Sequence, residues 1–449
     1  MLKTALSVVC LSSILFLYNE KQKEFPPIEE ELPLIWKAPI GGASFRTNIL
    51  FQKDQLIIGS NGSNFRDYGI MDLNSGVYIL DRKTGKIKKR IAGQLLGDMD
   101  VNGVIEHNGK LYFGNDNEEF LCTSFDGKIL WRNPTSGDIE HEPVLIKTAK
   151  SSLIVYASES GQVTAVNPES GSIIWNYFTR DYDGWKPGQN RAVFKVKAYV
   201  SNTSSFYTKP HVADLNRDGI ADLAYRTYYG ELIALNGANG RELWTFKREK
   251  HYLNFASHID HNNGDPILEF IEYEYDEKYN GKPNIIRINR FGKLIREKGL
   301  GSIKYNNSLN YLKLGKNQVM LMDSDSIIVT NGDRTLSSIA HAVPFKKLDY
   351  NKDTVIENRN ASTGIFASEV FSFRGHKRCV MIQFQHDEAF FEKGILEIVS
   401  LDTKEVLYRL QLPSAAEMEP VIKDVNSDGK LDVLINCYDG YLYCYSLGN

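Results

Sequence analysis

The chain has 449 residues, of which 42% are hydrophobic and 24% charged, and its formal net charge is −3. This composition is typical of one large folded domain with a core big enough to be stable alone. Acidic and basic residues nearly balance and no basic stripe dominates, which excludes nucleic acid as the expected partner. The 24 Tyr and 22 Phe favour an all-β protein.

The N-terminus carries a predicted export segment. Lys3 precedes a mostly apolar run from residue 5 to 18, and polar residues follow up to Glu24. The run is short for a membrane span, yet no small-x-small cleavage site is obvious. Residues 1–24 are therefore either a signal peptide or an uncleaved membrane anchor, followed by a linker over residues 25–30. We expect the protein to be periplasmic or extracellular, with any membrane attachment through this segment only.

Two segments, 161–175 and 230–244, are copies of one pattern. Five positions carry the same residue at the same spacing, namely Gly161, Ala165, Asn167, Gly171 and Trp175, then Gly230, Ala234, Asn236, Gly240 and Trp244. The alternation at the start predicts a half-buried strand, with Val163 and Ala165 inward. The Asn starts a tight turn, and the second Gly supplies its left-handed residue. The next strand then delivers a Trp, which we expect to pack between neighbouring sheets.

Looser copies of this pattern begin near residues 76, 118, 284, 325, 394 and 440. Most intervals are about 40–55 residues, the size of a four-stranded propeller blade. Two longer intervals predict inserts near residues 176–208 and 335–370. The copies predict eight blades, or seven if the weak copy near residue 325 belongs to its neighbour.

The two ends of the repeat region are complementary. Residues 440–445 supply the first strand of a hairpin, and no second strand follows them. Residues 32–36 form a short strand that ends in Trp36, like the second strand of each copy. Pairing the two would remove two free sheet edges, which invite aggregation. The sequence therefore predicts one propeller over residues 31–449, closed by an N-terminal strand.

An aspartate-rich loop occurs twice. Its oxygen-bearing positions 1, 3, 5, 7 and 9 are Asp214, Asn216, Asp218, Ile220 and Asp222, then Asp424, Asn426, Asp428, Lys430 and Asp432. Side-chain oxygens at four positions and a backbone carbonyl at position 7 suit Ca²⁺, and the Gly at position 6 permits the sharp turn. An EF-hand needs Glu at position 12, where Tyr225 and Ile435 stand. The alternative to a calcium site is a plain hairpin turn with solvated carboxylates.

A second motif, Glu-x-Glu-Pro, also occurs twice. It comprises Glu140, Glu142 and Pro143, then Glu417, Glu419 and Pro420. Each copy stands just before the first strand of a blade, where Pro is tolerated because it donates no ladder hydrogen bond. Innermost strands surround the centre of a propeller, so these acids could converge there. With His141 and His211 they suggest a metal or cationic-ligand site, and the alternative is a hydrated polar tunnel.

The repeat unit resembles the PQQ-like propeller repeat, and the aspartate loops resemble those of FG-GAP or VCBS propellers. The resemblance covers most of residues 31–449 and implies an all-β propeller of four-stranded blades. It says little about function, because many PQQ-like propellers carry no quinone and fold does not determine function. Quinoprotein alcohol dehydrogenases have two adjacent cysteines beside the cofactor, whereas Cys10, Cys122, Cys379, Cys437 and Cys444 are all separated. Cys437 and Cys444 are read as isolated thiols or as a pair across neighbouring strands.

The inserts are the expected place for ligand binding, since loops on a rigid scaffold carry binding sites. Tyr182, Trp185 and Lys186 in one insert, and residues 351–360 in the other, have no packing duty that the repeat explains. The alternative is an insert that folds over its own blade.

The sequence shows no phosphate-binding loop, nucleophile elbow or Cys/His nucleophile arrangement. We therefore expect an exported, calcium-stabilised propeller that acts as a non-catalytic binding or scaffold module for a protein or glycan. The alternatives are a calcium-dependent polysaccharide-active enzyme, such as the rhamnogalacturonan lyases of this architecture, and thirdly a quinone-dependent dehydrogenase.

Overall fold

The computed structural model consists of strands, turns and connectors in the part of the chain that it describes. No helix in that part is long and apolar enough to cross a membrane. The described residues are 32–62, 74–91, 99–149, 151–180, 182, 206, 208–228, 230–262, 264–275, 281–299, 310–313, 318–323, 326–331, 334–340, 362–373, 375–386, 393–403 and 405–448.

Consecutive strands form antiparallel sheets of four. The first contains β2 (Ile49–Phe51), β3 (Gln55–Ser60), β4 (Gly76–Asp81) and β5 (Ile87–Ile91). The second contains β6 (Val104–His107), β7 (Lys110–Asn115), β8 (Glu119–Ser124) and β9 (Ile129–Pro134). The third contains β10 (Val144–Lys147), β11 (Ser152–Ala157), β12 (Gln162–Val166) and β13 (Ile173–Phe178). The fourth contains β14 (His211–Ala213), β15 (Asp222–Arg226), β16 (Leu232–Leu235) and β17 (Glu242–Phe246).

The later sheets continue this plan. The fifth contains β18 (His251–Asn262), β19 (Asp265–Tyr275), β20 (Gly281–Asn289) and β21 (Leu294–Gly299). The sixth contains β22 (Asn310–Lys313), β23 (Gln318–Asp323), β24 (Ser326–Asn331) and β25 (Arg334–Ala340). The seventh contains β26 (Ser362–Ala367), β28 (His376–His386), β29 (Lys393–Ser400) and β30 (Val406–Leu412), and a fifth strand, β27 (Phe371–Phe373), pairs with β28 outside this order. The terminal sheet contains β31 (Val421–Lys423), β32 (Asp432–Cys437), β33 (Tyr441–Ser446) and β1 (Leu34–Pro39).

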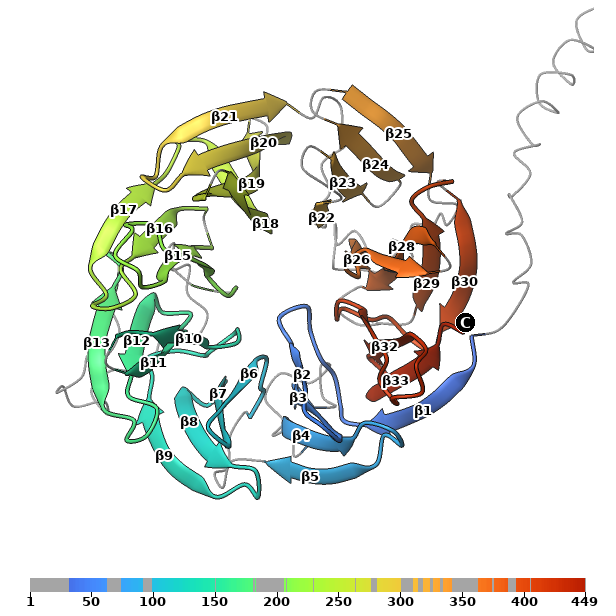
Figure 1. Cartoon of the computed structure of the whole chain (residues 1–449), viewed down its shortest axis with the longest axis horizontal. Coiled ribbons are helices and arrows are strands. Elements are labelled where there is room, and N and C mark those ends of the chain that lie inside the picture. The colour runs from blue at the N-terminus through green and yellow to red at the C-terminus, as the bar shows by residue number, and fades with distance from the viewer. Residues whose placement is uncertain are drawn as a thin grey trace, which may run out of the picture.

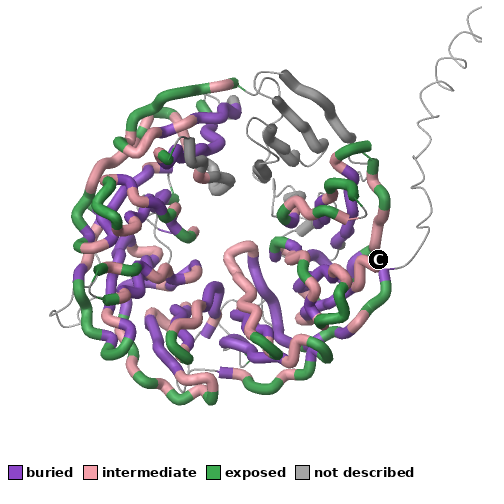
Figure 2. Tube along the Cα trace, in the orientation of Figure 1, coloured by how far each residue is buried: buried purple, intermediate pink, exposed green. Residues whose placement is uncertain are grey.

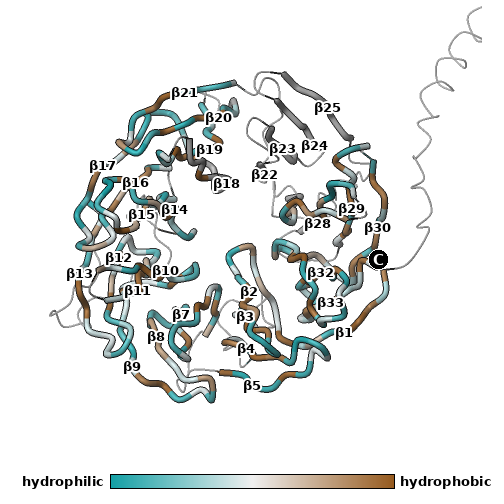
Figure 3. Tube along the Cα trace, in the orientation of Figure 1, coloured by the Kyte–Doolittle hydropathy of each residue, from teal (hydrophilic) through white to brown (hydrophobic). Residues whose placement is uncertain are grey.

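The sheets stand radially around a common centre, as Figure 1 shows, with β9, β13 and β17 on the rim. This arrangement confirms the predicted all-β propeller of four-stranded sheets. Each predicted copy of the repeat supplies the third strand of a sheet and, except at the chain's end, its fourth strand. The predicted insert 335–370 contains β26 and most of β25. Figure 3 shows hydrophobic residues along the strands, interspersed with hydrophilic ones.

In the terminal sheet, the first described strand pairs with the last. β1 pairs antiparallel with β33, with Trp36 opposite Cys444 and Ala38 opposite Leu442. Cys437 and Cys444 lie on neighbouring strands of this sheet and are both free and buried, as are Cys122 and Cys379. Burial raises the pKa of these four thiols above the ordinary value, so they act as small apolar core residues.

A Trp on the rim strand of one sheet packs against a turn Gly of the next. An added Cβ would lie 2.5 Å from Trp36 at Gly85, 2.6 Å from Trp131 at Gly171, 2.4 Å from Trp175 at Gly240 and 2.6 Å from Trp244 at Gly292. Each indole Nε1 also donates to a backbone carbonyl of the same turn, at 2.7–3.3 Å. The predicted packing role of these Trp residues is confirmed, and Gly is needed both for its positive φ and for space.

One burial prediction is wrong. The alternation at Val163 and Ala165 predicts a half-buried strand, but all five residues of β12 are buried. The reason is that each sheet is covered by a neighbour on both faces, so both sides of an inner strand lose water. The polar side is satisfied internally, because Thr164 donates to Asn176 Oδ1 at 2.8 Å and Gln162 donates to Thr164 at 3.0 Å. Figure 2 shows that exposed residues concentrate on the rim.

Buried carboxylates in the fifth and seventh sheets are paired with arginine. Glu269 pairs with Arg287, and Glu397 pairs with Arg409 through two hydrogen bonds. Glu272, whose side chain is 1% exposed, lies 2.7 Å from Arg248 Nη1 and 3.0 Å from His251 Nδ1. Burial raises the pKa of Glu272 to about 7 despite Arg248. A buried charge of this kind is costly unless its partner stays in place.

Candidate functional site

The segment between β1 and β2, residues 41–48, reaches into the middle of the ring (Figure 2); we call it the central loop. Its Ala43 N–H donates to Asn436 Oδ1 at 2.6 Å, and Asn436 Nδ2 donates to Gly41 O at 2.8 Å. On the opposite side Asn48 exchanges two hydrogen bonds with the backbone of Val104. The central loop therefore joins the terminal sheet to the first and second sheets.

The first glutamates of the two Glu-x-Glu-Pro motifs have different partners, Arg46 of the central loop for Glu140 and Tyr438 for Glu417. Arg46 pairs with Glu140, whose Oε2 also accepts a hydrogen bond from Asn102 Nδ2 at 2.7 Å. Glu417 accepts a hydrogen bond from the hydroxyl of Tyr438. Burial and Glu417 raise the pKa of Tyr438, and Arg46 is close enough to oppose that shift. Arg46 thus pairs with the connector that precedes the third sheet and lies near Tyr438 of the terminal sheet.

The second glutamates lie around Lys209. Lys209 Nζ is 2.9 Å from Glu142 Oε1, and the lysine side chain remains 67% exposed. Burial opposes its charge, yet Glu142, Glu419 and Glu369 together raise the pKa of Lys209. Desolvation by the surrounding protein raises the pKa of Glu419, although its side chain is accessible to solvent. The two motifs thus meet in one charged group, the central cluster, formed by Arg46, Glu140, Glu142, Lys209, Glu369, Glu417 and Glu419.

The two cations of the central cluster were not identified from the sequence. Lys209 precedes Pro210 and β14 just as Glu142 precedes Pro143 and β10, and as Glu419 precedes Pro420 and β31. This shared position in the repeat is a signal that the sequence does contain. Arg46 left no such signal, because it pairs with a residue 94 positions away.

The histidines do not join the carboxylates in a metal site. His141 is 2% exposed, burial lowers its pKa to about 4, and its Nδ1 lies 2.9 Å from Glu142 O. The His141 side chain is therefore a buried, neutral imidazole. His211 packs edge-on against Phe270, with ring centroids 5.2 Å apart. Among the described residues, no three His, Cys, Asp or Glu side chains are arranged to hold a metal ion.

The first aspartate loop joins β14 to β15 and is closed by hydrogen bonds to its own backbone. Asp214 accepts the N–H groups of Asp218 and Gly219 at 3.1 and 3.0 Å, and Asp218 accepts that of Ile220 at 2.8 Å. Asp222 accepts the N–H groups of residues 215, 216 and 237 at 2.9–3.1 Å. Position 4, Arg217, and Gly219 have positive φ values of 65° and 84°. The side chains thus fix the shape of the turn through hydrogen bonds to its own backbone.

The second aspartate loop joins β31 to β32 and repeats this geometry. Asp424 accepts two backbone N–H groups at 3.0–3.1 Å, and Asp428 accepts that of Lys430 at 2.9 Å. Asp432 is fully buried, its Oδ2 accepts the N–H of Val425 at 2.9 Å, and its Oδ1 has no hydrogen-bond partner. A buried, unsatisfied carboxylate oxygen is rare in native proteins.

The predicted ligand-binding residues of the inserts are placed only in part. Tyr182 packs on Phe178, with ring centroids 4.7 Å apart, and its N–H donates to Thr179 O at 3.1 Å. Trp185, Lys186 and residues 351–360 lie outside the described residues.

Comparison with known proteins supports the fold. Residues 74–244 match the model of a family described as outer membrane protein assembly factor BamB. Comparison with curated proteins finds no match. The structure resembles BamB from Moraxella catarrhalis, with 12% identity, a TM-score of 0.51 and coverage of 89% of this chain and 96% of that one.

Two further solved structures are similar. The Dos1 propeller has 13% identity and a TM-score of 0.57, over 93% of this chain and 96% of that one. Quinohemoprotein alcohol dehydrogenase ADHIIG from Pseudomonas putida HK5 has 12% identity and a TM-score of 0.51, over 95% of this chain and 78% of that one. Identities this low establish the fold and not the activity. With the internal repeats, they support a β-propeller fold, and the family match supports PQQ-like repeats over residues 74–244.

Proposed function

We propose that this protein is an exported β-propeller that acts as a non-catalytic binding or scaffold module for a protein or glycan partner. The central cluster carries the proposal. Arg46 pairs with Glu140 and Lys209 with Glu142, so the charges facing the centre are held in fixed places by connectors of several sheets. A preorganised charged surface is suited to recognition. The resemblance to BamB, an assembly factor by its description, favours a protein partner.

The same proposal includes the architecture and location expected from the sequence. Eight blades, with β1 completing the last one, agree with the pairing of Trp36 and Cys444 across β1 and β33. Such pairing of the chain ends removes two free edges. Export is supported by the apolar segment within residues 1–24.

We further propose that the two aspartate loops bind Ca²⁺, as in FG-GAP or VCBS propellers. In each loop, the side chains at positions 1, 3, 5 and 9 and the backbone carbonyl at position 7 would hold the ion. The first loop runs from Asp214 to Asp222 and the second from Asp424 to Asp432. The buried, unpartnered Oδ1 of Asp432 supports this fit, because a cation would satisfy it. Burial also raises the pKa of Asp222 and Asp432, although backbone N–H groups donate to both carboxylates.

Chelation of calcium is expected to destabilise the protein. A ligand that binds only the folded state at a hundredfold excess over its Kd stabilises it by about 2.7 kcal/mol. Thermal unfolding with millimolar Ca²⁺ or with chelator measures this shift. Asp424→Asn loses the charge and one of the two oxygens that accept backbone N–H groups, so it should reduce the shift. Asp126→Asn, in an ordinary exposed turn, is the control. Identical curves with calcium and chelator would contradict calcium binding.

A screen of glycans and candidate proteins, with and without chelator, tests the binding role. Saturable binding without product formation supports the binding role. Cleavage of an anionic polysaccharide would contradict it and identify the protein as a polysaccharide-active enzyme. Trp185→Ala is expected to weaken binding by about 2 kcal/mol or more, the effect of an aromatic hot spot, while leaving the melting temperature unchanged. Loss of stability with unchanged affinity would instead make Trp185 structural.

A further inference from the structure

An arginine from the neighbouring sheet donates hydrogen bonds to the backbone carbonyls of each aspartate loop. Arg82 follows Asp81 at the β4–β5 turn, and Arg290 follows Asn289 at the β20–β21 turn. Both occupy the same place in the repeat, directly after the Asp or Asn that starts the turn. Both turns belong to the sheet that follows the one carrying the aspartate loop.

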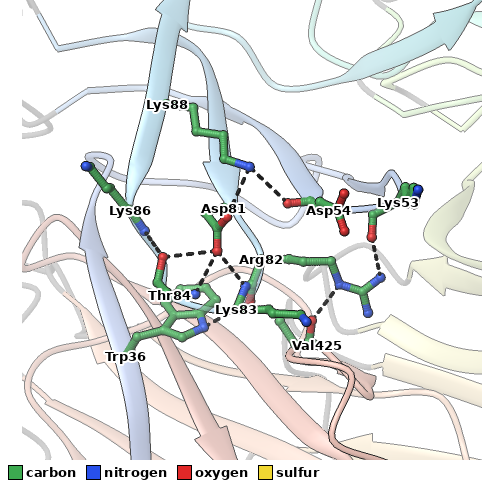
Figure 4. Close-up of polar contacts among 10 residues, drawn as sticks. All are labelled: Trp36, Lys53, Asp54, Asp81, Arg82, Lys83, Thr84, Lys86, Lys88 and Val425. Carbon is green, nitrogen blue, oxygen red and sulfur yellow. Dashed lines mark hydrogen bonds and ion pairs between the residues drawn. The ribbon is translucent and has the colours of Figure 1, made fainter.

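Arg82 makes the contact with the second loop (Figure 4). Its Nε donates to Val425 O at 2.6 Å and its Nη2 donates to Asp424 O at 2.5 Å, while Nη1 lies 3.4 Å from Lys53 O. Hydrogen bonds from a charged donor are about twice as strong as neutral ones. The guanidinium therefore ties positions 1 and 2 of the loop to the first sheet.

Arg290 makes the equivalent contact with the first loop. Its Nη1 donates to Leu215 O at 3.0 Å, and Leu215 is loop position 2, as Val425 is. Arg290 is also 3.3 Å from Asp265 Oδ1, which pairs with Arg217 of the same loop at 2.6 Å. The arrangement thus recurs at two junctions, between the terminal and first sheets and between the fourth and fifth.

The backbone carbonyl of each arginine also accepts a hydrogen bond from a rim Trp. Arg82 O accepts a hydrogen bond from Trp36 Nε1 at 3.1 Å, and Arg290 O accepts one from Trp244 Nε1 at 2.7 Å. Trp36 belongs to the same sheet as the second loop, and Trp244 to the same sheet as the first. A single residue therefore joins the loop backbone, the turn and the rim Trp.

We propose that Arg82 and Arg290 are positioning residues that couple cation occupancy of each aspartate loop to the packing of the next sheet. This proposal rests on calcium binding by the loops. The carbonyls that the arginines hold belong to positions 1 and 2, next to the ligand-bearing side chains of positions 1 and 3. A cation that orders those positions fixes the two carbonyls, and the guanidinium transmits this order to the turn. Without the cation, the loop and the junction loosen together.

Hydrogen exchange of the full chain, with calcium or chelator, tests the coupling. In the unmodified protein we expect chelator to accelerate exchange of the backbone N–H groups in 424–432 and also in 82–86, across the junction. Arg82→Ala should raise exchange in 82–86 about tenfold, the ratio expected for loss of charged hydrogen bonds. That exchange should no longer respond to calcium, whereas 424–432 still responds.

Two controls are available, the equivalent junction at Arg290 and a second residue on the turn of Arg82. Arg82→Ala should leave the calcium response of 289–293, at the Arg290 junction, unchanged, and Lys83→Ala on the same turn should behave like the unmodified protein. A calcium response of 82–86 that survives Arg82→Ala would overturn the coupling alone. If calcium protects neither loop in the unmodified protein, and no calcium binding is found by titration calorimetry, the calcium proposal itself fails and the coupling with it.

Discussion

Replacing Gly240 by alanine is expected to destabilise the propeller by about 2–5 kcal/mol. Gly240 has a φ of 70°, which costs an alanine about 1–2 kcal/mol. The new Cβ would also lie 2.4 Å from Cε3 of Trp175, a distance that forces the indole or the turn to move. Overpacking of a filled site adds about 1–3 kcal/mol. Denaturant unfolding of the purified variant measures the sum.

Gly109→Ala is the matched control for this variant. Gly109 has a φ of 74°, and an added Cβ there would meet no atom within 4 Å. Its cost should therefore be the backbone strain alone, about 1–2 kcal/mol. In the Trp175→Leu background, Gly240→Ala should cost less than in the unmodified protein, because the smaller side chain leaves room for the methyl group. Equal losses in Gly240→Ala and Gly109→Ala would show that the contact with Trp175 contributes nothing.

Local chemistry explains why the repeat could be predicted from the sequence. The turn in 161–175 is specified by Asn167, whose Oδ1 accepts two backbone N–H groups, and by Gly171 with its positive φ. Both signals lie within five residues of each other, so no knowledge of the fold is needed to read them. The strand that precedes them and the Trp that follows were then placed correctly.

Contacts between distant segments could not be predicted in the same way. Burial of both faces of β12 depends on sheets that flank it in the ring. The pairing of Arg46 with Glu140 depends on a loop whose course the pattern does not describe. Arg82 resembles any exposed turn residue until the second aspartate loop is placed beside it. The repeat predicts the strands and turns within a sheet. The charged contacts between sheets depend on how the sheets are arranged in the ring.

Replacing Arg248 by methionine is expected to destabilise the protein strongly at pH 8 and much less at pH 5.5. Arg248 Nη1 lies 2.7 Å from the carboxylate of Glu272, whose side chain is 1% exposed. Removing one partner of a buried ion pair costs about 3–5 kcal/mol, because the other charge stays buried. Thermal or denaturant unfolding at several pH values measures the difference between variant and parent.

The pH dependence follows from the pKa of Glu272, which burial raises from 4.5 to about 7 even with Arg248 present. Since the folded protein binds this proton more tightly than the unfolded chain, ionised Glu272 lowers stability above pH 7, and the penalty fades as the pH falls towards 4.5. Loss of Arg248 raises the pKa further, so the variant regains stability on acidification more steeply than the parent. Arg180→Met, at a side chain that is 81% exposed and 3.8 Å from Glu242, should change stability by less than about 0.5 kcal/mol at any pH. A cost for Arg248→Met that is the same at pH 8 and pH 5.5 would mean that the arginine contributes through packing and not through its charge.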